Sequence, residues 1–126
     1  MTMLSRSGIL DAPDLEHQDV DVPAWGGTVR VRAMTGRERD DLRVVMVDNR
    51  DVISVVTANL LAVTLVDENG ARLFLPEDVE RLRGKDALTL DNLFAVAMRL
   101  NKMDKDAVDT AAKNLEAAPS GDSGLG

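Results

Sequence analysis

The most restrictive pattern in this 126-residue chain lies at residues 19–33, where two alternating segments flank the pair Gly26 and Gly27. Before the glycines, valines alternate with aspartates. After them, Val29, Val31 and Ala33 alternate with polar residues. A period of two is typical of β-strands, and glycine supplies the positive φ that tight hairpin turns need. The pattern therefore predicts a β-hairpin over 19–33.

Two further features specify how this hairpin pairs. Pro23 has no N–H to donate, so we expect the first strand to be an edge strand or to pair only as far as Val22. The polar positions carry opposite charges, with aspartates on the first strand and arginines on the second. We expect these side chains to face outward and to form cross-strand pairs; they are Asp19, Asp21, Arg30 and Arg32.

Helices are expected to follow the hairpin directly. Thr35 and Glu38 have the spacing of a capping box, which predicts a helix over 36–47. Asp51 is expected to cap a second helix over 52–65. This segment is apolar on nearly all sides and so belongs at the centre of the fold. Its β-branched residues leave a strand open as an alternative, although its length and apolar spacing favour a helix.

Three more helices are expected further along the chain, at 76–83, 87–100 and 105–115. Asn69-Gly70 predicts a turn or a small hairpin before them. Gly84 is expected to take a left-handed conformation after the third helix. Asp86 or Thr89 is expected to begin the fourth, which has a clear apolar stripe.

Together these elements predict an α+β fold, mainly α, in which an N-terminal β-hairpin is followed by a bundle of about four to five short helices. We expect a single globular domain over 19–116. Residues 1–18 show no periodicity and are expected to form a flexible arm. Residues 117–126 have the composition of a disordered tail.

Composition excludes several classes of function. The chain has no cysteine, which removes disulfides and thiolate metal sites and favours a reducing compartment. Its formal charge of −7 disfavours direct binding to nucleic acid, which relies on clusters of lysine and arginine. The longest apolar stretch is too short and too interrupted to span a membrane. The N-terminus has no pattern of a signal peptide.

Nothing in the sequence predicts catalysis, a cofactor or a metal. The Gly-Asp-Ser-Gly run at 121–124 resembles the surroundings of a serine nucleophile, but the chain's one histidine, His17, lies in the opposite arm. The acidic stretches that begin at Asp67 and Asp104 lack the ligand spacing of a calcium loop. We expect a protein that is not an enzyme, with no catalytic, cofactor-binding or metal-binding residues.

Three features of the sequence are candidates for binding a partner protein. Trp25 is either a plug over the hydrophobic core, the reading we favour, or an exposed interface anchor. Methionines between Met34 and Met46, together with Met98 and Met103, could add an adaptable apolar surface. The helix expected at 105–115 has mostly small inward residues, which bury little area, so it is expected to be the least securely docked; the residues of interest in it are Val108, Ala111, Ala112 and Leu115.

The order of short motifs resembles the tail assembly chaperones of long-tailed (siphovirus-type) bacteriophages. The resemblance covers about residues 18–118. It is carried by the Trp-Gly-Gly hairpin at 23–32, the helix start at 35–40, the Leu-Val-Asp-Glu-Asn-Gly run at 65–70, Leu73-Phe74, Glu77-Asp78-Val79, and the helix residues 93–101. The arm over 1–18 is longer than the family pattern.

The resemblance implies a chaperone that binds and solubilises the tape measure protein and recruits tail tube subunits during tail assembly. It also implies a location in the host cytoplasm and absence from the mature virion. On this basis the helix at 105–115, or the groove that it covers, is the expected tape-measure site. The hairpin with Trp25 is expected to serve self-association or tube contact.

Two rival functions remain open. The chain could be a structural virion component, such as a head–tail connector or tail-completion protein. It could also be an acidic mimic of DNA, although its acidic residues are spread over helix caps and turns instead of along one continuous face.

Overall fold

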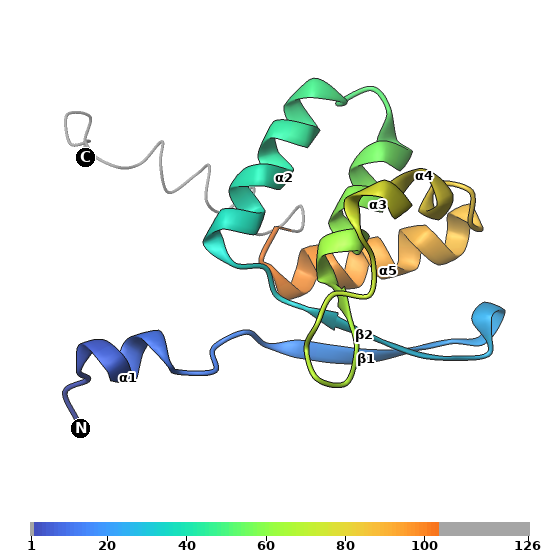
Figure 1. Cartoon of the computed structure of the whole chain (residues 1–126). Coiled ribbons are helices and arrows are strands. Elements are labelled where there is room, and N and C mark those ends of the chain that lie inside the picture. Colours follow the sequence, from blue (N-terminus) through green and yellow to red (C-terminus); the bar gives the residue numbers. More distant parts are fainter. Residues whose placement is uncertain (1, 104–126) are drawn as a thin grey trace, which may run out of the picture.

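The computed structural model of the chain describes residues 2–103 (Figure 1). A three-stranded antiparallel sheet lies on one side, and four of the five helices in this part of the chain pack together above one face of it. The fifth, α1 (Arg6–Leu10), stands apart at the N-terminus. The predicted fold class, α+β with more helix than strand, is confirmed.

The hairpin forms as the alternation predicted. Strand β1 (His17–Val22) pairs with β2 (Gly27–Arg32), which also pairs with β3 (Leu65–Val66). The strand order is therefore β1-β2-β3, so β1 is an edge strand and its pairing ends at Val22. A 3₁₀ turn, η1 (Pro23–Trp25), joins the two strands. Gly26 follows it with φ 73°, a left-handed conformation that glycine adopts at no steric cost.

The outward charges pair only in part as predicted. Arg30 lies opposite Asp19, and its Nε is 2.7 Å from Asp19 Oδ1. Asp21 lies opposite Thr28 and accepts a hydrogen bond of 2.9 Å from the Thr28 hydroxyl. The prediction for Arg32 was wrong: its side chain is buried beside helix α2 (Gly36–Asp48) instead of facing outward, because the carboxylate of Glu38 in that helix accepts its hydrogen bond.

Strand β3 (Leu65–Val66) was not predicted. It pairs with β2 in register Arg30 to Val66 and Val31 to Leu65, and it takes the last residue of the segment expected as the second helix. The turn predicted at Asn69-Gly70 follows it. There the Asp67 carboxylate accepts N–H hydrogen bonds from the backbone of Asn69 and Ala71, and an isolated bridge joins Val66 to Arg72.

Helix α2 (Gly36–Asp48) begins with the predicted capping box. The Thr35 hydroxyl accepts from the Glu38 N–H at 3.1 Å, and Glu38 Oε1 accepts from the Thr35 N–H at 2.9 Å. Helix α3 (Ile53–Thr64) follows, but Asp51 does not cap it as expected. Val52 occupies the N-cap position, and no side chain makes a capping hydrogen bond.

The segment predicted as a third helix at 76–83 is a 3₁₀ turn, η2 (Pro76–Asp78), followed by the short helix α4 (Val79–Leu82). Gly84 was expected to be left-handed, but the positive-φ glycines in the described part of the chain are Gly26 and Gly70. The chain turns instead through an ordinary backbone conformation, in which the Gly84 N–H donates to the Arg81 carbonyl.

Helix α5 (Ala87–Leu100) matches the range predicted for the fourth helix. Its N-cap is Asp86, whose carboxylate accepts from the N–H and the hydroxyl of Thr89. These hydrogen bonds lower the pKa of Asp86. The last predicted helix, 105–115, and the tail lie outside the described residues.

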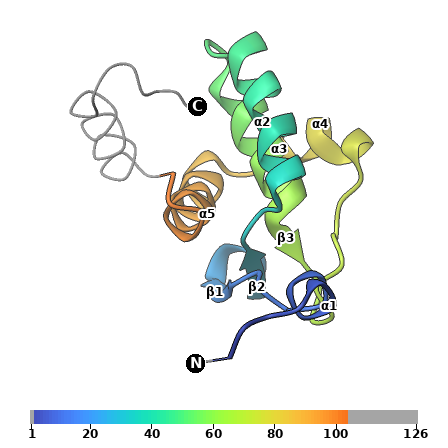
Figure 2. The ribbon, with the colours of Figure 1, turned by 90° about the vertical axis from the view of Figure 1, so that its left-hand side faces the viewer.

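The core forms where α3 and α5 meet the sheet. Helix α3 packs against α5, α2 and α4, so its predicted central position is correct. Figure 2 shows α2 and α3 running together, with α5 beside them and the strands below. Most of the core consists of leucine and valine; the largest fully buried side chains of the main cluster are Leu60, Leu61, Leu65, Leu93 and Val31. A smaller cluster of Ala58, Ala62 and Leu82 holds α4 on α3.

Candidate protein-binding surfaces

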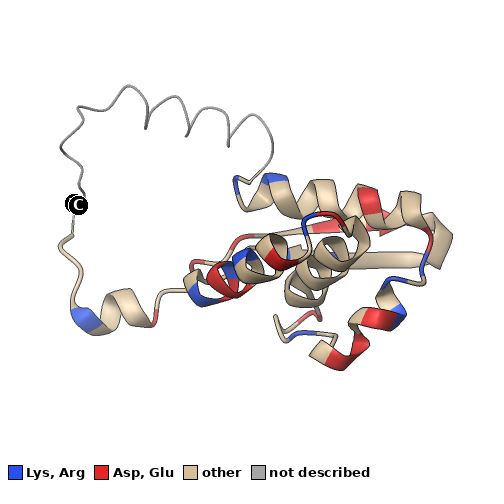
Figure 3. Ribbon diagram, turned by 90° about the horizontal axis from the view of Figure 1, so that it is seen from above, with Lys and Arg blue, Asp and Glu red and all other residues tan. Residues whose placement is uncertain are grey.

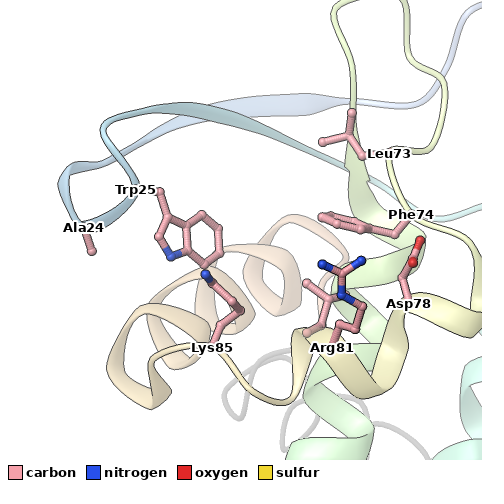
Figure 4. Close-up of a pocket in the computed structure, with 8 residues that line it drawn as sticks. Ala24, Trp25, Leu73, Phe74, Asp78, Arg81 and Lys85 are labelled. Atoms are coloured by element: carbon pink, nitrogen blue, oxygen red, sulfur yellow. The ribbon is translucent and has the colours of Figure 1, made fainter.

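A groove opens between the tip of the hairpin and helix α4. We call it the Trp25 groove; its volume is about 730 Å³, and it is lined by Ala24, Trp25, Leu73, Phe74, Asp78, Arg81, Leu82 and Lys85. These side chains come from η1, from the segment after β3, from η2 and α4, and, for Lys85, from the loop that follows α4 (Figure 4). The hairpin tip and the segment 73–85, which are far apart in sequence, therefore build one concave surface.

The local sequence explains how Trp25 reaches this groove. Pro23 starts the 3₁₀ turn, and the Gly26 N–H closes it with a hydrogen bond of 3.1 Å to the Pro23 carbonyl. Trp25 is partly buried and packs against the main core cluster. The Lys85 ammonium lies 5.9 Å from the centroid of its ring, close enough for a cation–π interaction. Trp25 therefore covers the core with part of its surface and lines the groove with the rest.

The groove combines an apolar floor with a cationic rim. Leu82 is buried and Phe74 partly buried, while Leu73 is 50% exposed. Arg81 and Lys85 are exposed and form no ion pair with any residue that the structure describes. Such a surface suits an apolar segment that also carries negative charge.

A second apolar region lies where α2 ends and α3 begins. We call it the helix-tip surface; its residues are Val44, Val47, Val52 and Ile53, with exposed fractions of 61, 61, 41 and 73%. A shallow hollow of about 250 Å³ opens beside it, lined by Met46, Arg50, Ile53, Val56, Thr57 and Phe94. Exposed apolar side chains on the end of one helix and the start of the next make this region a candidate protein-binding surface.

A buried ionic network joins the sheet to α2. Arg32 Nη2 donates to Glu38 Oε2 at 2.9 Å and to the Val63 carbonyl at 3.1 Å, and Arg72 Nη2 donates to the same Glu38 oxygen at 2.6 Å. Partial burial alone would raise the pKa of Glu38. The hydrogen bonds from Arg32, the Thr35 backbone and Arg72 outweigh that effect and lower the pKa to about 2. The network fixes α2, and with it the helix-tip surface, on the sheet.

Residues 2–103 contain neither a cluster of metal-binding side chains nor a membrane-spanning helix. No group of three or more potential metal ligands occurs in that range. No helix there is long and apolar enough to cross a membrane. Acidic residues are spread over α2, α4 and α5 with basic residues among them (Figure 3), so these helices do not present the continuous acidic face that a DNA mimic needs.

The sequence anticipated one of the groove residues and missed the others. Trp25 lies in the groove, whereas Val108, Ala111, Ala112 and Leu115 lie outside the described residues. The expected methionine surface was wrong: Met34 is buried, and Met46, Met98 and Met103 pack against the main core. The groove residues Phe74, Arg81 and Lys85 were missed because they meet Trp25 only through the tertiary fold.

A local signal did exist for the helix-tip surface. Val44 and Val47 lie off the inward stripe of α2, and the segment of α3 carries more apolar residues than one buried face requires. That excess predicts neighbours on several sides, and α3 has them in α2, α4 and α5. The first residue of α3, Ile53, is nevertheless 73% exposed.

Comparison with known proteins finds a likeness among solved structures. No protein-family model and no curated protein matches the sequence. Among solved structures, the chain is similar to one described as the structure of bacteriophage HK97 tail assembly chaperone, with a TM-score of 0.57 and 21% sequence identity. The match covers 68% of this chain and 85% of that chain. This protein therefore shares a fold with the tail assembly chaperone of HK97.

Proposed function

We propose that this protein is a tail assembly chaperone of a long-tailed bacteriophage. The observation that carries the proposal is the likeness in fold to the HK97 tail assembly chaperone over most of that chain's length. The order of sequence motifs supports the same family independently of the fold. The proposed activity is binding without catalysis.

The proposed partner is the tape measure protein of the same phage, which the chaperone keeps soluble while it recruits tail tube subunits. A long helical protein with exposed apolar side chains needs a partner with apolar surface of its own and a net charge that keeps the complex in solution. The helix-tip surface provides four exposed aliphatic side chains, and the formal charge of the chain is −7. These features support the role of a holding chaperone.

The predicted helix at 105–115 is a second candidate for contact with the tape measure protein, through Val108, Ala111, Ala112 and Leu115. Its small apolar residues would let it move aside or bind a partner helix at little cost in buried area. A chain lacking residues 105–126 should then solubilise the tape measure protein less well on co-expression. Unchanged solubility would remove this segment from the binding surface.

Pull-down from cells that co-express the chain with the tape measure and tail tube genes of the same genome tests the proposed partners. We expect the tagged chain to retain both proteins. It would retain the tube protein either by binding it directly or through the tape measure protein. Retention of neither protein would contradict the proposal.

The rival function, a permanent virion component such as a head–tail connector or tail-completion protein, makes a different prediction. A chaperone acts in the host cytoplasm and leaves the particle. Mass spectrometry of purified virions should therefore detect the tape measure and tube proteins but not this chain. Its presence in stoichiometric amounts would favour the structural role.

A further inference from the structure

The hollow of about 250 Å³ beside the helix-tip surface lies where three helices meet. We call it the three-helix hollow. Its apolar lining comes from all three helices: Met46 of α2, Ile53 and Val56 of α3, and Phe94 of α5. Met46, Val56 and Phe94 are only half-buried, and Ile53 is 73% exposed. The hollow is therefore an apolar surface that residues 2–103 leave partly open to solvent.

The chain turns back over α5 where that helix ends. The Lys102 N–H donates to the Arg99 carbonyl at 3.1 Å, and the Met103 N–H donates to the Met98 carbonyl at 2.7 Å. These two hydrogen bonds form a Schellman motif, which closes the end of a helix. Lys102 has φ 57°, the left-handed conformation that this motif needs and that residues other than glycine rarely adopt. The described chain therefore ends over the last turn of α5 instead of continuing along its axis.

The last described residue, Met103, lies on the path from this turn to the hollow. Met103 is half-buried and packs against the main core cluster, as do Met98 and Phe94. In a Schellman motif the residue after the turn frequently contacts the helix residue that accepts its hydrogen bond, which here is Met98. Met98 and Phe94 are four residues apart and so lie on one face of α5. That face leads from Met103 to the hollow.

The segment that follows Met103 has the pattern of a helix that would fit the hollow. The apolar residues of the helix predicted at 105–115 share one face; they are Ala107, Val108, Ala111, Ala112 and Leu115. Most of these side chains are small, which lets a helix approach closely and suits a shallow hollow. A helix of this length is marginal alone in water, so we expect it to form only where it has a surface to pack on.

We propose that residues 105–115 form a helix that packs into the three-helix hollow of their own chain. Val108 would pack against Phe94, and the apolar residues after it would cover Ile53. The exposed valines of α2 do not line the hollow, so part of the helix-tip surface would stay open for a partner. This inference does not depend on the proposed function, because it concerns the chain alone.

The reach of the segment favours the hollow of the same chain over that of a second copy. Phe94 lies four residues before Met98, which is about 6 Å along the helix. The residues 104–108 can span about 17 Å when extended, so Val108 can reach Phe94 without any movement of α5. A segment tethered this closely has an effective concentration in the millimolar range, which a second copy does not match in dilute solution.

Amide hydrogen exchange of the full chain, measured by NMR, tests this contact. In the wild-type protein the amides of residues 108–115 should exchange at least about tenfold more slowly than in an unstructured peptide of the same sequence. The protection should be the same over a range of protein concentrations, because the contact lies within one chain.

A matched pair of variants locates the contact. Ile53→Asp places a charge in the hollow and leaves residues 105–115 unchanged, so a loss of protection there reports the contact and not the helix propensity of the segment. We expect protection of 108–115 to fall by at least about tenfold. Val44→Asp changes an exposed valine outside the hollow and should leave the protection unchanged. Both side chains are exposed, so circular dichroism should give melting temperatures within a few degrees of the wild type.

A nitroxide label gives a second measurement of the same contact. The chain has no cysteine, so Thr110→Cys, which lies away from the apolar face of the predicted helix, carries the only label. The label should broaden the methyl signal of Met46 in the hollow and leave that of Met3 in the N-terminal arm unchanged. Adding Ile53→Asp should remove most of the broadening at Met46.

Four results would overturn the proposal. One is exchange of residues 108–115 at the rate of an unstructured peptide. Another is protection that rises with protein concentration, which would assign the contact to a second copy. A third is protection and broadening that are the same with and without Ile53→Asp. The fourth is protection that appears only when the tape measure protein is co-purified, which would assign the segment to that partner. Because the first three measurements use the chain alone, their failure leaves the proposed chaperone function untouched.

Discussion

Arg32 at the end of β2 donates a hydrogen bond of 2.9 Å to Glu38 in the first turn of α2, and both side chains are nearly buried, with 11% and 13% of their area exposed. Glu38 also closes the capping box with Thr35, so one carboxylate both starts the helix and attaches it to the sheet. Arg32 Nε has no hydrogen-bond partner among residues 2–103. The guanidinium therefore depends on Glu38 and on two backbone carbonyls for its remaining contacts.

Replacing Glu38 should destabilise the fold. Glu38→Gln keeps the shape of the side chain but leaves the charge of Arg32 without a counterion in a buried site. We expect the free energy of unfolding, measured by urea titration, to fall by about 2–3 kcal/mol. The control is Glu80→Gln, which breaks the Arg83 pair of an acid that is 75% exposed and should cost less than about 0.5 kcal/mol. Equal losses in the two variants would contradict a special role for Glu38.

The same residue makes stability depend on pH in an acidic range. The pKa of Glu38 is about 2 in the folded protein against an ordinary value of 4.5. Between these values the unfolded chain binds a proton that the folded chain does not, so stability falls as the pH falls from 4.5 toward 2. Above that range the contribution is fully present.

The measurement is the urea midpoint of the wild type and of Glu38→Gln at several pH values from about 6 down to 2. Asp19 and Asp86 also have lowered pKa values, the former mainly through its hydrogen bond from Arg30, but both are present in the two proteins. The difference between the two curves should therefore shrink as the solution is acidified. A constant difference would mean that Glu38 does not carry this dependence.

The glycine pair at the hairpin tip should respond unequally to alanine. Gly26 has φ 73°, and no atom lies within 4 Å of the position where a Cβ would be added. The cost of Gly26→Ala is therefore the left-handed backbone alone, about 1 kcal/mol. Gly27 has equally open space and no positive φ, so Gly27→Ala should leave the unfolding midpoint unchanged within error. A similar loss in both variants would show that the turn geometry is not the cause.

The sequence predicted those parts of the fold that depend on local pattern. Alternation around Gly26 determined the hairpin and its edge position, and the Thr35 and Glu38 spacing placed the start of α2 correctly. The apolar stripe of α5 gave its range. In each of these cases the residues that decide the structure are neighbours in the chain.

The failures concern residues whose partners lie far away in sequence. Arg32 looked like an outward strand residue, because nothing nearby shows that the Val63 carbonyl, 31 positions later, lies beside its guanidinium. Strand β3 has two residues and exists only because β2 pairs with it. The Trp25 groove was missed for the same reason, since α4 reaches the hairpin tip only in the folded protein.

The fraction of tape measure protein that stays soluble on co-expression tests the central claim most directly. Wild-type chain should raise that fraction well above the level without it. The variant Val44→Ser with Val47→Ser and Ile53→Ser should lose most of the gain while melting within a few degrees of the wild type, because all three side chains are exposed. Leu88→Ser, which changes a leucine that is 68% exposed on α5, should keep the gain. If wild-type chain leaves the tape measure protein as insoluble as it is alone, the account of this protein as a tail assembly chaperone is contradicted.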